Sequence, residues 1–230
     1  MAYADDTAVT REAVSTRFVA NVYGWMFGGL LLTAGIAGYI GVNEQIARDV
    51  ASSGLILPLI IVELLLVLAI SFAINKMPPA LAMLLFAVYS ALNGVTLSII
   101  FLAYTTGSIA GVFAATAGMF GVMSLYGYVT KRDLTTMGNL LFMALIGMII
   151  AWVVNIFLHN DTLTLILSWL GVVIFTGLTA YDTQKIKQIG ASGIEGTAAE
   201  RAAIIGALAL YLDFINLFLS LLRIFGSSRD

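Results

Sequence analysis

Two acidic residues of the 230-residue chain stand inside long apolar runs, where a carboxyl group is unexpected. Glu63 lies within the run 54–74, and Asp213 lies within the run 202–225. A carboxylate at the centre of a membrane-spanning helix costs about 2.5 to 3.5 kcal/mol even on the most lenient scale. We therefore expect both carboxyl groups to face the interior of the helix bundle, a partner or a water-filled path. For Glu63, a purely structural role as a protonated acid bonded to a neighbouring helix is the alternative.

Two further positions extend this chemistry. Asn216 lies one helical turn after Asp213 on the same face, so that two polar groups share one stripe. Asp182 follows the apolar run 162–181 and is predicted to close that helix near the membrane surface. The alternative for Asp182 is an interfacial ion pair with Lys185, worth at most about 1 kcal/mol. Spacing alone leaves the choice between a site and an ion pair open.

Composition indicates that membrane-spanning helices position these groups. The chain is 60% hydrophobic and 10% charged, and its mean hydropathy is +1.01. Soluble domains are about half apolar and about a quarter charged. A helix needs about 20 apolar residues to cross a bilayer, and polar clusters with Pro and Gly divide the chain into seven such runs. These are 18–41, 54–74, 79–102, 108–129, 138–158, 162–181 and 202–225.

The sequence therefore predicts an all-α membrane protein with seven transmembrane helices. A polar tail at 1–17 precedes a single transmembrane domain at 18–225, and a short tail follows at 226–230. The length of the first apolar run argues against a cleaved signal peptide.

Basic residues predict how the chain is oriented. With the N-terminus and the second, fourth and sixth connections on one side, that side holds eight of the 11 basic residues. The positive-inside rule places this side, with the N-terminus, in the cytoplasm, and an odd number of crossings places the C-terminus outside. Arg223 and Arg229 then lie outside, so a last helix that enters the membrane without fully crossing is an alternative.

Several function classes are excluded by what the sequence contains. The net charge of −2, without a block of basic residues, argues against a nucleic-acid partner. Without cysteine there is no thiol nucleophile and no thiolate metal site. Motifs of ATPases and of serine or aspartyl membrane proteases are missing, and His159 is the single histidine. We expect no enzyme activity and no bound cofactor.

Two motifs around the aspartates resemble the Bax inhibitor-1 family. They are Ala-Tyr-Asp-Thr-Gln-Lys-Ile at 180–186 and Ala-Leu-Ala-Leu-Tyr-Leu-Asp-Phe-Ile-Asn-Leu-Phe at 207–218. Segments 23–26, 89–98 and 123–128 are similar to other parts of the family pattern, especially in its bacterial members.

The resemblance implies a seven-helix bundle in a bacterial inner membrane, with the last helix wrapped by two groups of three. It also implies a pH-sensitive calcium leak, controlled by a closely approaching aspartate pair that matches Asp182 and Asp213. Glu63 matches an acidic position in the family's second helix. Where bacterial members can carry an arginine that engages the pair, this chain has Lys76, a weaker candidate for the counter-ion.

A mechanism follows from the chemistry of two close carboxyl groups. They share a proton, and when both are ionised they repel each other unless a cation intervenes. Ca²⁺ favours several oxygen ligands, so protons and calcium compete for the pair. We expect Asp182 and Asp213 to bind the transported Ca²⁺ transiently, with Glu63 and Asn216 along the ion path.

Two other functions stay open from the sequence. One is a regulatory protein that binds a membrane-bound quality-control protease, for which the bacterial family offers precedent. Its candidate contacts are the N-terminal tail and the connection at 190–200. The other is a cation/proton exchanger, because one buried acid pair serves either a channel or a transporter.

Overall fold

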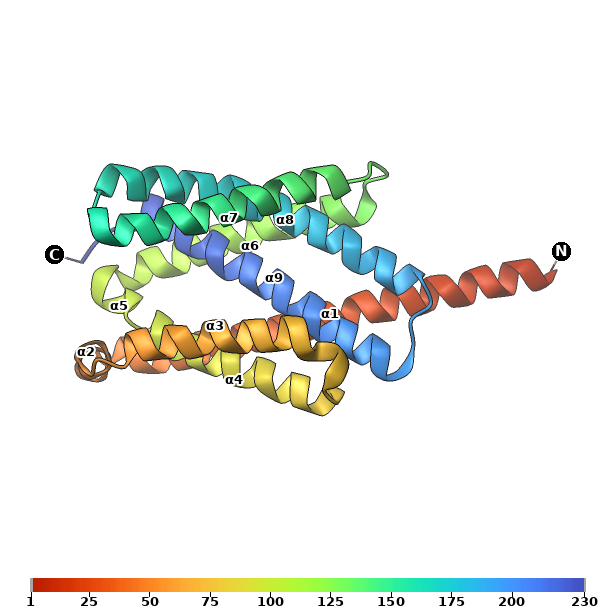
Figure 1. The fold of residues 1–230 in the computed structure, drawn as a ribbon, viewed down its shortest axis with the longest axis horizontal. Helices are drawn as coiled ribbons and strands as arrows, with labels where there is room; N and C mark the ends of the chain where they lie inside the picture. The colour runs from red at the N-terminus through yellow and green to blue at the C-terminus, as the bar shows by residue number, and fades with distance from the viewer. Residues whose placement is uncertain (1, 230) are drawn as a thin grey trace. The chain divides into compact units, whose positions relative to one another are not determined.

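A computed structural model describes the backbone of residues 2–229 and the side chains of residues 15–229. Its elements are α1 (Ala2–Val42), α2 (Glu44–Ser52), α3 (Ile56–Ala73), η1 (Ile74–Lys76), α4 (Pro79–Leu97), α5 (Ile100–Ala103), α6 (Thr106–Val129), α7 (Thr135–Leu158), α8 (Asp161–Ala191) and α9 (Gly196–Phe225) (Figure 1). The predicted N-terminal tail is helical from Ala2 onward. Met1, Asp230 and the side chains of residues 2–14 lie outside the described residues.

Seven helical segments of the described chain are long and apolar enough to cross a membrane. They are Ser15–Val42, Ile56–Lys76, Pro79–Ala103, Thr106–Val129, Thr135–Leu158, Asp161–Ala191 and Gly196–Phe225. Each overlaps one of the seven predicted runs, which confirms the prediction of an all-α membrane protein. The spans differ in enclosure: 67% of the residues in the most apolar window of α9 are buried, against 11% for α3 and α7. Most side chains of α3 and α7 therefore face outward, and α9 is the enclosed helix.

Backbone packing divides the chain into two compact units, with boundaries inside α8 and α9. The first unit comprises residues 1–103, 186–211 and 229, and the second comprises 104–185, 212–228 and 230. The first half of α9 thus belongs with α1, α3 and α4, and its second half belongs with α6, α7 and α8. These are the two groups of three spans that the resemblance implies for the last helix.

In the first unit, aromatic side chains hold α9 against α4. The ring of Tyr211 meets the edges of Phe86 and Tyr89, with centroids 5.8 and 5.5 Å apart. A Cβ on Gly206 of α9 would lie 3.1 Å from the side chain of Val22 on α1, so this side chain packs directly on the α9 backbone. α3 and α4 form a hairpin through η1, with Pro79 in the first turn of α4 (Figure 1).

In the second unit, phenylalanine rings join α9 to α6. Phe214 packs edge-on against Phe113 and Phe120, with centroids 5.2 and 5.4 Å apart. On α7, the ring of Trp152 lies under the guanidinium of Arg223, 4.6 Å from ring centroid to guanidinium carbon. Such cation–π contacts favour a cation near the end of a span.

Three local features differ from the sequence prediction. α8 runs to Ala191, ten residues past the predicted end at 181. The third predicted run bends, because α4 ends at Leu97 and α5 begins at Ile100. The sequence does not predict α2, a short helix whose Asn43 cap accepts a hydrogen bond from Ile46 N at 3.3 Å. A nine-residue helix with one buried residue, Ala47, is too short and too polar to appear as an apolar run.

Candidate functional site: an aspartate pair and a buried glutamate

The second unit brings the two predicted aspartates together. The carboxyl groups of Asp182 on α8 and Asp213 on α9 lie close enough to interact with each other directly. Two close carboxyl groups form a hydrogen bond only when one of them holds a proton, which the two then share. The side chain of Asp213 is 4% exposed, and its Oδ2 has no hydrogen-bond partner among the described residues.

The position of Asp182 corrects the sequence prediction. Asp182 lies nine residues before the end of α8 and does not close the helix as predicted. The helix continues because Thr183, Ile186 and Gly190 keep one face buried beyond it. An amphipathic last section of this kind is less apolar than a span, so hydropathy alone predicts a connection there.

Close packing of α6 and α7 fixes the position of α8 just before Asp182. A Cβ on Gly127 of α6 would clash with the carbonyl oxygen of Ala180. A Cβ on Gly138 of α7 would clash with the ring of Tyr181. Glycine at these two positions lets α6 and α7 approach α8 directly before Asp182, as small residues do in membrane helices.

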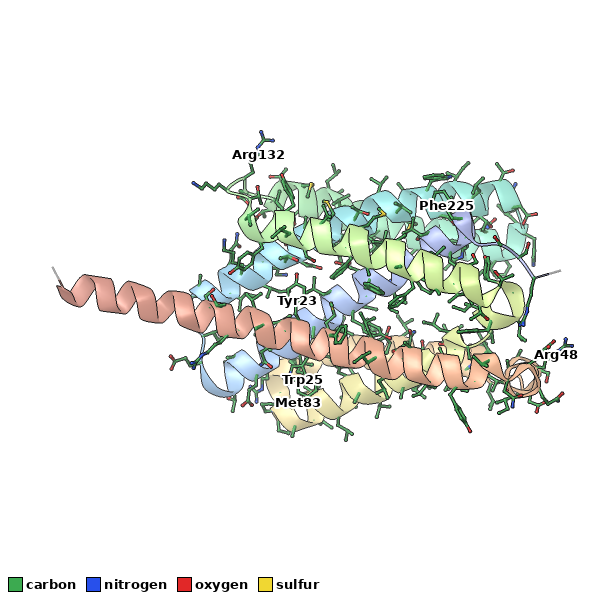
Figure 2. All side chains as sticks on the ribbon, turned by 180° about the vertical axis from the view of Figure 1, so that it is seen from behind. Tyr23, Trp25, Arg48, Met83, Arg132 and Phe225 are labelled. Atoms are coloured by element: carbon green, nitrogen blue, oxygen red, sulfur yellow. The ribbon has the colours of Figure 1, made fainter. Side chains whose placement is uncertain are left out.

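Gln184 ties α8 to the connection between α6 and α7. Its Oε1 accepts a hydrogen bond from Leu134 N at 2.9 Å, and its Nε2 donates to the carbonyl oxygen of Arg132 at 2.8 Å. The side chain is 8% exposed. Figure 2 shows Arg132 itself projecting away from the ribbon at this connection.

Lys185 does not form the simple ion pair with Asp182 that was the alternative from the sequence. Lys185 is exposed and its Nζ lies 5.9 Å from the centroid of the Tyr181 ring. It still interacts favourably with the charge on Asp182. Lys76 is exposed at the end of η1, in the first unit. The role of Lys76 as a counter-ion stays a prediction.

Asn216 is occupied by its own helix. Its Nδ2 donates to the carbonyl oxygen of Leu212 at 2.8 Å, and its backbone oxygen accepts from Ser220 Oγ at 2.7 Å. The predicted part of Asn216 in an ion path requires its side chain to leave this bond, or to use its amide oxygen as a ligand.

Glu63 lies in the first unit, where it is 8% exposed. Asn93 Nδ2 donates to its Oε2 at 3.1 Å, and Thr96 Oγ1 donates to its Oε1 at 3.0 Å. Glu63 and Ile70 are the only buried residues of α3, and they lie two helical turns apart on the same face. The acid is therefore the polar group by which α3 binds α4.

Two buried hydroxyl groups of the second unit are not among the predicted site residues. Ser124 Oγ on α6 and Thr176 Oγ1 on α8 are buried without a hydrogen-bond partner among the described residues. Like Asp213 Oδ2, they are oxygen atoms free to accept a hydrogen bond or to contact a cation. Hydroxyl groups inside spans are the only sequence signal for them, and most such groups simply bond to their own helix.

The described residues contain no cluster of three or more Asp, Glu, His or Cys side chains suited to a metal ion. Ca²⁺ takes six to eight oxygen ligands, so two aspartates supply only part of a coordination shell. Hydroxyl, carbonyl or water oxygens would have to complete it. This donor set fits a passing ion better than a resident one.

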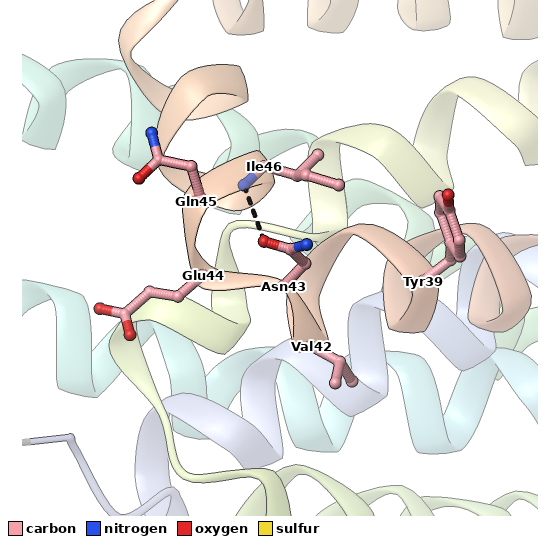
Figure 3. A pocket seen from close by; sticks show the side chains of 6 residues that line it. All are labelled: Tyr39, Val42, Asn43, Glu44, Gln45 and Ile46. Atoms are coloured by element: carbon pink, nitrogen blue, oxygen red, sulfur yellow. Dashed lines mark hydrogen bonds between the residues drawn. The ribbon is translucent and has the colours of Figure 1, made fainter.

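A surface hollow at the junction of α1 and α2 is not part of this site. It is lined by Tyr39, Val42, Asn43, Glu44, Gln45 and Ile46 (Figure 3). Its one acid, Glu44, pairs with Arg48, and that hydrogen bond holds the pKa of Glu44 below its usual range. None of the predicted site residues lines the hollow.

The comparisons with known proteins agree with these motifs. The sequence pattern of the family Bax1-I, described as "Inhibitor of apoptosis-promoting Bax1", matches residues 15–230. The chain is 49% identical over 227 residues to "Inner membrane protein YbhL" of Escherichia coli K12, covering 97% of each chain. It is 48% identical to an "Uncharacterized protein" of Deinococcus radiodurans, covering 96% of this chain and 94% of that one. The name of the Escherichia coli relative places that protein in the inner membrane. This chain belongs to the Bax inhibitor-1 family.

Proposed function

We propose that the protein is a pH-sensitive leak for cations, calcium above all, and that the pair of Asp182 and Asp213 controls it. The observation that carries the proposal is the close approach of two carboxyl groups, the half-buried Asp182 and the buried Asp213, whose Oδ2 has no hydrogen-bond partner among the described residues. A proton and a cation are the two species that relieve repulsion between close carboxylates.

The pair can act as a switch because its bond joins two helices. While one proton is shared, the carboxyl groups tie α8 to α9. Loss of that proton replaces the bond by repulsion unless a cation takes its place, and the equilibrium between two helix arrangements shifts accordingly. Calcium binding thus releases a proton, and calcium binds the pair more tightly as the pH rises.

The ion path in this proposal uses oxygen atoms that have no hydrogen-bond partner among the described residues. Ser124 Oγ and Thr176 Oγ1 supply such atoms in the second unit. Glu63 would serve as an ion site in the first unit once its proton is lost. No energy source is needed, since an electrochemical gradient drives a leak.

Calcium flux into proteoliposomes tests the proposal. We expect a flux that changes with pH in the wild type, and a flat pH profile in Asp182→Asn, because an amide forms hydrogen bonds but does not titrate. Asp161→Asn is the matched control: it removes an exposed acid from the same helix and should keep the wild-type profile. A wild-type flux equal to that of empty liposomes would refute the proposal.

The same vesicles separate a leak from an exchanger. A leak lets calcium run down its own gradient whatever the proton gradient is. An exchanger would accumulate calcium when only a proton gradient is imposed. We expect no accumulation.

A further inference from the structure

A chain of buried polar side chains crosses four helices of the first unit. It starts at Glu63 on α3, whose Oε2 lies 3.1 Å from Asn93 Nδ2 on α4. Asn93 Oδ1 lies 3.1 Å from Tyr211 Oη on α9. Tyr211 Oη lies 2.6 Å from Thr33 Oγ1 on α1, which donates to the carbonyl oxygen of Ser90 at 2.7 Å. All five residues are at most 8% exposed.

The hydrogen atoms available to this chain can be counted. It contains four contacts: Glu63 to Asn93, Asn93 to Tyr211, Tyr211 to Thr33, and Thr33 to the Ser90 carbonyl. Tyr211 and Thr33 each have one hydroxyl proton, and the carboxamide of Asn93 donates toward only one of its two neighbours. Three donors therefore serve four contacts, and the fourth donor can come only from Glu63.

One arrangement fills all four contacts. The carboxamide of Asn93 is turned by half a turn, which exchanges its nearly isosteric nitrogen and oxygen. Protonated Glu63 then donates to Asn93 Oδ1, Asn93 Nδ2 donates to Tyr211, Tyr211 donates to Thr33, and Thr33 donates to the Ser90 carbonyl. With Glu63 ionised, Asn93 Nδ2 faces the carboxylate and one contact lacks a proton.

We infer that Glu63 is a proton-binding site whose proton sets the direction of the hydrogen bonds that run from α3 through α4 and α9 to α1. This site is separate from the aspartate pair, which belongs to the second unit. The other carboxyl oxygen of Glu63, Oε1, lies 3.0 Å from Thr96 Oγ1, whose one proton also faces the carbonyl oxygen of Asn93 at 3.1 Å.

The polar contacts of Glu63 are to uncharged groups. Asn93 and Thr96 contact its carboxyl oxygens, and no ion pair to Glu63 is present among the described residues. Tyr89 on α4 and Tyr211 on α9 are the titratable groups that sense its charge, and α1 presents the hydroxyl of Thr33. A lone carboxylate here would face a polar chain short of one donor.

The consequence of proton loss reaches α9. Tyr211 stands two residues before Asp213 in the same helix. When Glu63 ionises, the bond directions reverse and one contact to α9 or α1 is lost, since every member of the chain has a fixed number of protons. The inference rests on the proposed function and deepens it. Glu63 becomes a second proton-binding site, and it must lose its proton before it can bind a cation.

Infrared spectroscopy of the full-length protein in lipid tests the inference without measuring flux. We expect the protonated carboxyl absorption at neutral pH to contain a component, beside that of the aspartate pair, that is lost in Glu63→Gln and unchanged in Glu200→Gln, an exposed control. The amide introduced by Glu63→Gln can donate in place of the carboxyl proton and keep the four contacts filled, so this variant should fold normally. No difference between the wild type and Glu63→Gln in this band would overturn the inference.

A second pair of variants tests the relay itself. Tyr211→Phe removes the hydroxyl that extends the chain, so the bond from Glu63 to Asn93 should weaken and the Glu63 band should move to higher frequency. Tyr89→Phe removes a hydroxyl from the ring beside Tyr211 and should leave the band in place. Equal bands in both variants would show that Tyr211 does not belong to the relay. If the expected differences between the spectra are absent, the inference about Glu63 is wrong and the calcium proposal is unaffected. If no calcium flux is found, the calcium proposal is wrong and the inference about Glu63 is unaffected.

Discussion

Asp182 and Asp213 lie close together, but the protein encloses them differently. Asp213 is 4% exposed, whereas Asp182 is half-buried and has the charge of Lys185 nearby. Asp213 therefore depends on the pair for its solvation, while Asp182 retains some contact outside it. An uncompensated charge costs most where it is most deeply buried, so replacing Asp182 should disturb Asp213 more than the reverse.

Asp133 gives a pH dependence outside the membrane spans. The hydroxyl and the backbone N–H of Thr135 donate to its Oδ1 at 2.6 and 2.9 Å. These bonds lower the pKa of Asp133, the side-chain bond most. A lowered pKa means that the stabilisation is present above the usual range of an aspartate and is lost as the pH falls through the lowered value. Thermal unfolding in detergent should show Asp133→Ala less stable than the wild type at neutral pH.

The same comparison of the wild type with Asp133→Ala at acidic pH can contradict the prediction. Below the lowered pKa the wild type has lost this contribution, so the two unfolding midpoints should converge. A difference that stays constant from neutral to acidic pH would contradict the assigned role.

Gln184 should matter for stability through its two buried bonds. Gln184→Ala leaves Leu134 N without its partner, and an unsatisfied buried donor costs about 1 to 3 kcal/mol. Gln188→Ala, one turn later on an exposed part of α8, is the control. Thermal unfolding should rank Gln184→Ala below Gln188→Ala. Equal midpoints would mean that the connection before α7 is held by other contacts.

At the scale of the helices, close approaches decide where the site residues meet. The register of α6 against α8 depends on Gly127, where an added Cβ would meet the carbonyl of Ala180. A methyl group there would push α8 away two residues before Asp182. Through this packing, Gly127 affects the geometry of the aspartate pair although it has no side chain that could take part in the site.

Gly127→Ala tests this packing. We expect it to destabilise the protein by about 1 to 3 kcal/mol, as overpacking of a close contact does. Gly121→Ala on the same helix has no atom within 4 Å of the added Cβ and should unfold no earlier than the wild type. The measurement is thermal unfolding of both variants, and a Gly127→Ala midpoint equal to that of Gly121→Ala would contradict the close approach.

The sequence predicts the spans well and the contacts poorly, for physical reasons. A bilayer requires about 20 apolar residues per crossing, which is visible in the chain without knowing any neighbour. The end of α8 escapes prediction because Gln184 and Lys185 look like a connection until the buried face of Ile186 is seen. Glu63 could be placed inside a span, but its bonds to Asn93 and Thr96 depend on how α3 packs against α4, and sequence spacing carries no information on that.

At the scale of the whole molecule, the orientation in the membrane is still a prediction from charge. The positive-inside rule places the connection between α8 and α9 in the cytoplasm and the connection between α2 and α3 outside. The chain has no cysteine, so a single introduced thiol reports its side. Ser192→Cys and Ser53→Cys put thiols at exposed positions in these connections.

Labelling of intact cells with a membrane-impermeant thiol reagent measures the orientation. We expect reaction at Ser53→Cys in intact cells, and at Ser192→Cys only after the membrane is opened. The reverse pattern would invert the topology. Reaction of both in intact cells would contradict the odd number of full crossings between these positions, because α3 to α8 would then not separate them as predicted.

If protons control calcium passage through the aspartate pair, a variant in which one aspartate cannot titrate should lose the pH dependence of the flux. Calcium flux into proteoliposomes is followed across a pH series for the wild type and for Asp213→Asn, which keeps the size of the more buried side chain of the pair and removes its titration. We expect the wild-type flux to change with pH and the Asp213→Asn flux to be the same at every pH. Parallel pH profiles in the two proteins would contradict the account.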